Sequence, residues 1–237
     1  MNRAGLALLG GTAALLLGSA TAVTAQPTGS RINTDRLVHD PVTGWRYGRC
    51  AANFRPEASE ALLASAPFSA ASEAAFDRVT NRNDDRCYTQ ARYGGQTLYL
   101  DETVLRGQIA QGRYLGKYPD RAPPAIARAT ASTIPVEVYN QRIRSASNQQ
   151  AEILRIVGDC VVAADPAGVD RLIRTGVTSD EEGRATGALS EHFGPCLWEG
   201  QSIEFSLESL RAALADALYR RSEGRTVMAV AEGSTNE

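Results

Sequence analysis

The sequence predicts an all-α protein made of two duplicated helical units, each closed by its own disulfide and each with room for one short extended segment. Three observations support this fold class. A long stretch of the chain recurs once, both copies contain two cysteines at matching places, and apolar residues recur three or four positions apart, as on one face of a helix.

The repeat joins a first stretch that ends at Tyr114 to a second that ends at Tyr219. Residues of several types match in the same order in both stretches. The matched pairs are Cys50 and Cys160, Pro56 and Pro166, Cys87 and Cys196, Gln96 and Gln201, Arg106 and Arg211, and Tyr114 and Tyr219. Conservative replacements fill the gaps between these identities, so we infer an internal duplication.

The duplication sets the expected organisation. The first unit should span residues 45–116 and the second 148–222, with a linker at 117–147 that contains four prolines, among them Pro123 and Pro124. Residues 26–44 should form an N-terminal arm and residues 223–237 a frayed tail.

Residues 1–25 have the pattern of a signal peptide. Arg3 provides a positive start, Leu6–Leu17 is apolar, and Val23-Thr24-Ala25 is a small-residue cleavage site before Gln26. The apolar run is shorter than the roughly 20 residues that span a bilayer. We therefore expect export to the periplasm or medium, with no membrane span after cleavage.

The charge balance excludes one class of partner. With 25 Lys and Arg against 27 Asp and Glu, the chain lacks the clustered basic surface that nucleic-acid binding needs. The partner remains open, another envelope protein being one candidate. We expect no cofactor.

Four cysteines allow three disulfide connectivities. A unit that folds alone must form its disulfide between its own two cysteines, which selects the pairs Cys50–Cys87 and Cys160–Cys196. A Cys₄ zinc site is the alternative, but it usually brings cysteines in close pairs, and here the spacings are dozens of residues. We therefore expect disulfides and no metal. A non-reducing peptide map linking Cys50 to Cys160 would contradict this pairing.

In the first unit we expect four helices. Turns at 39–44 precede a helix at Trp45–Phe54, a second helix starts at Pro56, and a third contains Phe76 and Val79. After a polar loop at Asn81–Asp85, Asp101 caps the fourth. Gly107 and Gly112 each lower the helix propensity of this last helix by about 1 kcal/mol, which predicts a less stable first unit.

The second unit shows the same plan more clearly. Its helices are expected from Asn148 to Ala164, from Pro166 to near Gly176 with Asp165 as the cap, from Ser179 to near His192, and after the cap Ser206. An alternating piece at 202–205 predicts a short extended segment.

No catalytic signature is present. The two histidines each stand beside an acid, His39 by Asp40 and His192 by Glu191, which can form a general base but is also typical of a surface helix end. For Gln96 and Gln201 we prefer a tight structural turn after glycine over a ligand-binding turn. Tyr114 and Tyr219 are interpreted as core-closing residues.

The repeated arginines allow two hypotheses. Arg106 and Arg211 could bind anions, one in each unit, or each could tie its helix to the rest of its own unit from the edge of the apolar stripe. We favour the second, which predicts that Arg211→Ala lowers stability by about 1–3 kcal/mol if the head group is buried and paired.

The repeat and its paired cysteines resemble those of uncharacterised exported bacterial proteins with duplicated, disulfide-paired helical repeats. The resemblance covers most of the mature chain and implies no activity. The sequence therefore favours a non-enzymatic binding or interaction module, with an enzyme in the cleft between the units and a structural envelope protein as alternatives.

Overall fold

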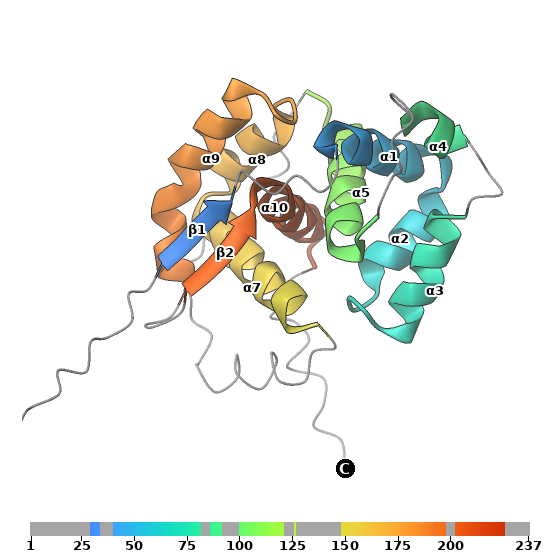
Figure 1. The fold of residues 1–237 in the computed structure, drawn as a ribbon, viewed down its shortest axis with the longest axis horizontal. Helices are drawn as coiled ribbons and strands as arrows, with labels where there is room; N and C mark the ends of the chain where they lie inside the picture. The colour runs from blue at the N-terminus through green and yellow to red at the C-terminus, as the bar shows by residue number, and fades with distance from the viewer. Residues whose placement is uncertain are drawn as a thin grey trace, which may run out of the picture.

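The computed structural model describes residues 29–33, 40–81, 86–91, 100–120, 126, 148–197 and 202–225. This part of the chain is mostly helical, as the sequence predicts. Two long helices, α5 (Glu102–Lys117) and α10 (Leu207–Ser222), lie side by side in the middle of the molecule. The first-half helices surround α5 on one side, and the second-half helices surround α10 on the other (Figure 1).

The first half contains α1 (Pro41–Phe54), α2 (Pro56–Ala64), α3 (Ala70–Val79) and α4 (Arg86–Ala91) before α5. The prediction of turns before Trp45 was wrong, because α1 already starts at Pro41. Asp40 causes this early start: its carboxylate accepts a hydrogen bond from the Val42 N–H, and Pro41 lacks an N–H that would need a partner. Asp101 caps α5 as expected, accepting from the Val104 N–H at 3.1 Å.

The second half contains α7 (Gln149–Ala164), α8 (Pro166–Arg174), α9 (Asp180–Phe193), a 3₁₀ turn at Gly194–Cys196 and then β2 (Ser202–Ser206) before α10. Ser179 and Ser206 form the expected N-terminal caps, and Asn148, where the sequence predicts the start of a helix, caps α7. The expected cap at Asp165 was wrong: its side chain makes no capping hydrogen bond and lies 3.7 Å from the Arg171 guanidinium instead.

The N-terminal arm is more ordered than the sequence suggests. Gly29–Asn33 forms β1, which pairs in parallel with β2 in the register Gly29 to Ser202. The predicted extended segment of the second unit is thus present as β2. Its counterpart in the first unit, both Gln96 and Gln201, and most of the predicted linker, polar loop and tail lie outside the described residues.

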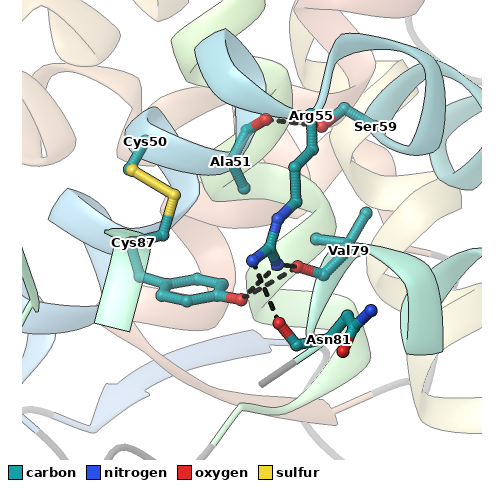
Figure 2. The surroundings of a disulfide bond; sticks show 8 residues. Cys50, Ala51, Arg55, Ser59, Val79, Asn81 and Cys87 are labelled. Atoms are coloured by element: carbon teal, nitrogen blue, oxygen red, sulfur yellow. Dashed lines mark hydrogen bonds between the residues drawn. A yellow bond between two sulfur atoms is a disulfide. The ribbon is translucent and has the colours of Figure 1, made fainter. Parts of the chain in front are cut away.

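Both disulfides have the predicted pairing. Cys50 on α1 bonds Cys87 on α4, and Cys160 on α7 bonds Cys196 in the 3₁₀ turn, across 37 and 36 residues. Figure 2 shows the first bridge beside Arg55, whose guanidinium donates to the backbone carbonyls of Val79 and Asn81. The disulfides therefore hold α4 and the 3₁₀ turn, and Arg55 holds the end of α3. Two such bonds indicate an oxidising compartment.

The two halves share one hydrophobic core. Fully buried leucines and isoleucines from both halves belong to the same cluster, among them Leu62, Ile109, Leu172 and Leu214. At the crossing of α5 and α10, Gly107 faces Ala212 so closely that a Cβ on the glycine would lie 2.2 Å from the Ala212 Cα. The missing side chain at Gly107 thus allows the two backbones to touch.

Candidate functional site

A cavity of about 170 Å³ lies where the two halves meet. It is bounded by α1, α5, the turn between α8 and α9, and α10, and so takes residues from both predicted units. Its apolar wall includes Pro41, Trp45, Val177, Leu207 and Ala212, and its polar wall includes Gln108, Gln111, Glu182, Glu208 and Arg211.

Arg211, from the middle of α10, forms one end of this cavity. Its guanidinium donates to the carbonyls of Ile173 and Thr175, the Thr175 hydroxyl, the Glu182 carboxylate and the Gln111 amide oxygen. A guanidinium has five N–H donors, so these five bonds engage all of them. Burial lowers the pKa of Arg211 below its usual value, and the nearby carboxylate of Glu182 opposes that shift.

Arg106 has a matching environment in the first half. It donates to the carbonyls of Leu62 and Ser65 at the end of α2, and to the Ser72 hydroxyl on α3. Its carboxylate partner is Glu102 from its own helix, at 3.7 Å, whereas Arg211 uses Glu182 from α9. Each arginine therefore connects the long central helix to the preceding helices of its own half.

The same two carboxylates hold two strained residues. Phe68 and Thr178 have φ values of 56° and 64°, in the left-handed region that side-chain-bearing residues rarely adopt. The Phe68 N–H donates to Glu102 and the Thr178 N–H to Glu182. Each buried carboxylate thus fixes a tight turn and balances an arginine, and the turn at Thr178 lines the cavity.

The repeated tyrosines connect the halves to each other. The Tyr114 hydroxyl donates to Asp170 on α8 at 2.5 Å, and the Tyr219 hydroxyl donates to Glu60 on α2 at 2.6 Å. Each hydroxyl therefore reaches the opposite half. Burial and the neighbouring carboxylate raise the pKa of both tyrosines, so both stay protonated donors.

Glu208 lines the cavity and, unlike Glu182, has no arginine paired with its carboxyl group among the described contacts. It stands in the first turn of α10 and accepts a hydrogen bond from the Gln108 amide at 3.2 Å. Burial, and to a smaller extent the nearby carboxylates of Asp101, Asp40 and Glu182, raise the pKa of Glu208 to about 7. The group therefore changes charge near neutral pH.

We expect Glu208→Gln to stabilise the protein at pH 8 by about 3 kcal/mol and to have little effect at pH 4. In the unfolded chain the carboxyl titrates near its ordinary value of 4.5, and in the folded protein near 7. The wild type therefore binds more protons when folded, and its stability falls as the pH rises between these values. Urea unfolding of both proteins at several pH values measures the difference, and an equal difference at pH 4 and 8 would contradict the expectation.

Two polar atoms at the cavity have no hydrogen-bond partner among the described residues. They are the indole Nε1 of Trp45 and the side-chain oxygen of Gln108, and both are buried. The Gln108 side chain as a whole is 7% exposed. Buried polar groups are nearly always paired in native proteins, so these two atoms are exceptions on residues that line the cavity.

The corresponding space beside Arg106 also lies between the halves, and it is almost closed. A cavity of about 20 Å³ beside Arg106 is lined by Arg155 and Asp216, which align with Trp45 and Gln111 when the two copies are superposed in sequence. Asp216 and Asp159 pair with the buried Arg220. Ion pairs near Arg106 thus fill the space that stays open near Arg211.

A second hollow, of about 470 Å³, lies beside Asp101, Asn148 and Phe205. Two of its polar side chains already have structural roles, since Asp101 and Asn148 cap α5 and α7. The cavity between the halves is therefore the stronger candidate.

Sequence reasoning named Arg211 but missed the rest of the cavity. Trp45, Gln108 and Glu208 carry no repeat or motif signal, since their aligned residues are Arg155, Ala213 and Thr103. His192 lies at the end of α9, 4.0 Å from Asp165, and does not line the cavity, while His39 lies outside the described residues. The described residues contain no cluster of potential metal ligands.

The two repeated arginines differ in what lies beside them. The hydrogen-bond acceptors around Arg211 adjoin an open cavity of about 170 Å³, whereas those around Arg106 adjoin one of only about 20 Å³. This difference locates the candidate site. The fold class, the disulfides and this cavity are the properties that the structure establishes. Comparison with family models, curated proteins and solved structures gives no match to this chain.

Proposed function

We propose that this chain is an exported, non-enzymatic binding module that holds a small ligand in the cavity between its two halves. The observation that carries the proposal is the cavity itself, which both halves line with a largely apolar wall and a few polar side chains, among them Gln108 and Glu208. Ligand sites are typically concave, largely apolar and supplied with a few oriented polar groups.

The proposal includes an origin by duplication, with units at 45–116 and 148–222. The matched environments of Arg106 and Arg211 and the reciprocal bonds of Tyr114 and Tyr219 support it. In this interpretation both copies retain the buried arginine with its backbone acceptors, and the cavity beside it is open only at Arg211.

Export follows from the predicted signal peptide at 1–25 and places the chain in the periplasm or the medium. The two disulfides support an oxidising destination. No helix in the described part of the chain is long and apolar enough to cross a membrane. The intact mass of the exported protein should correspond to a start at Gln26, and retention of residues 1–25 would contradict export by cleavage.

Of the alternatives, an enzyme in the cleft gains no support, because the cavity brings no histidine to its carboxylates among the described residues. A structural role in the envelope needs no cavity, so a ligand experiment separates it from the binding role.

Native mass spectrometry of protein purified gently from the exported fraction tests the binding role. We expect a small adduct on the wild type that disappears in Val177→Trp, because the indole would fill the cavity. Val104→Trp is the matched control, since Val104 lines the other hollow. If Val177→Trp does not fold, Leu207→Phe replaces it. An adduct that persists in a folded cavity-filling variant, or absence of any adduct on the wild type, would contradict the proposal.

A further inference from the structure

We propose that the ligand of the cavity is a small organic cation with a compact apolar body, such as a protonated primary amine on a ring. This inference rests on the proposed function and specifies the ligand class of the same site. It follows from three features of the cavity: the arginine whose donors are all engaged, the carboxyl group of Glu208, which has no cationic partner, and the volume.

Arg211 does not provide an anion site, although it is the only cation among the residues that line the described cavity. All five of its N–H donors are already engaged by protein acceptors. Its charge is balanced by Glu182 at 2.9 Å, where both side chains are at most 5% exposed. An anion would therefore have to break a buried pair, which costs several kcal/mol.

The charged residues other than Arg211 that line the cavity, Glu182 and Glu208, are acidic. Asp40 and Asp101, the N-caps of α1 and α5, lie near enough to raise the pKa of Glu208. Among the described residues, these carboxylates, Glu182 and Arg211 are the charged groups that face Glu208. A cation beside Glu208 would be attracted by all of them and would let Glu208 ionise at lower pH.

Glu208 has one described hydrogen-bond donor, the Gln108 amide nitrogen at 3.2 Å. A carboxylate can accept several hydrogen bonds, so Glu208 keeps capacity for a further donor. An ammonium group has three donors, no acceptor and the opposite charge, so it can pair with Glu208 while the Gln108 bond stays in place. This capacity of Glu208 is the observation that points to an amine rather than to a neutral apolar molecule.

The apolar wall sets the size of the body. A cavity of about 150 Å³ in an engineered protein holds benzene, so about 170 Å³ accommodates one small ring with an aminomethyl group. Trp45 lines the wall, and its ring already has the Arg49 guanidinium 4.7 Å from its centroid. The Trp45 ring therefore already has a cation partner and contributes apolar wall to the site.

The experiment uses three probes of similar size and different charge: benzylamine, benzyl alcohol and benzoate. Their dissociation constants for the full exported chain can be measured by ligand-observed NMR at pH 8. We expect benzylamine to bind at least about tenfold more tightly than benzyl alcohol, with benzoate weakest. Equal binding of the amine and the alcohol, or tighter binding of benzoate, would overturn the cation proposal.

The pH profile gives an independent readout. Because Glu208 has a pKa of about 7, its ionised fraction falls about tenfold from pH 8 to pH 6. Benzylamine stays protonated across this range, so its affinity should fall by about the same factor. Glu208→Gln should remove this pH dependence and weaken binding at pH 8 by at least about tenfold. An unchanged pH profile in Glu208→Gln would overturn the role of Glu208.

Glu73→Gln is the matched control, because Glu73 also stands in the first turn of a helix but is exposed and away from the cavity. It should bind all probes as the wild type does. The outcomes also separate the two proposals. If benzyl alcohol binds as tightly as benzylamine and Val177→Trp abolishes its binding, the ligand site is supported and the proposal of a cationic ligand is overturned. If none of the three probes binds, the proposal of a cationic ligand is overturned. The adduct seen by native mass spectrometry then remains the test of whether the protein binds a ligand at all.

Discussion

Arg211→Ala is expected to lower the free energy of unfolding by about 3–5 kcal/mol. This exceeds the estimate from sequence alone, because the structure shows what the guanidinium holds. Removing it leaves Glu182 as a buried charge with a 3% exposed side chain and removes the donors for the Ile173 and Thr175 carbonyls. It also loosens the carboxylate that fixes the left-handed Thr178.

Urea unfolding of the wild type and the variant measures this loss. Arg211→Lys should recover a small part of it, because an ammonium cannot reproduce the five-donor planar fork. Arg184→Ala is the matched control: Arg184 also pairs with a glutamate of α9, Glu181, but the two side chains are 72% and 62% exposed. Its effect should stay below about 1 kcal/mol.

A double-mutant cycle with Glu182→Gln isolates the pair. The Arg211→Ala, Glu182→Gln double variant should be more stable than the sum of the single effects predicts, because no buried charge is left unpaired. If Arg211→Ala costs no more than Arg184→Ala, the arginine does not tie α10 to α8 and α9, and the structural interpretation fails.

Much of each half could be predicted because local chemistry determines it. Asp101, Ser179 and Ser206 each cap the helix that follows, as short polar residues do wherever their side chains reach a free backbone N–H. The disulfide pairing followed from the requirement that each unit close itself. The arginines stand at the edge of an apolar stripe in the sequence, and in the structure both guanidinium groups bond to backbone carbonyls of the preceding helices.

The contacts between the halves could not be predicted, because they join residues far apart in the sequence. Tyr219 bonds Glu60 across 159 residues, and Gln108 bonds Glu208 across 100. These pairs depend on how α5 crosses α10, and nothing in either helix alone sets that crossing. The cavity therefore remained hidden, although Trp45 and Glu208 were visible in the sequence.

The errors of the sequence analysis have a common cause. The residue types suggested a helix cap at Asp165 and turns at residues 39–44. The partner that each carboxylate binds depends on which donors lie near it in the folded chain, and the local sequence does not determine that. Asp165 lies near Arg171 and His192, while Asp40 caps α1 and makes Thr43 and Gly44 helical. The parallel pairing of β1 with β2 spans almost the whole chain and leaves no local signal.

Gly107→Ala is expected to destabilise the protein by at least about 3 kcal/mol, although alanine is the better helix former. The new methyl group would lie 2.2 Å from both the Cα and the carbonyl oxygen of Ala212, and backbone atoms cannot rotate away as a side chain can. The central helices α5 and α10 would have to separate, and the shared core would open with them. Thermal and urea unfolding measure the loss.

Gly116→Ala distinguishes this close contact from helix propensity. Gly116 lies on the same helix, and a Cβ there would meet nothing within 4 Å, so the substitution should stabilise the protein by about 0.5–1 kcal/mol. If Gly107→Ala also stabilises, then Gly107 merely weakens α5, as the sequence alone suggests. If the two effects have opposite signs, glycine is required at the crossing. Because Ala212 and Gln108 border this crossing and line the cavity, Gly107→Ala should also weaken benzylamine binding, whereas Gly116→Ala should leave it unchanged.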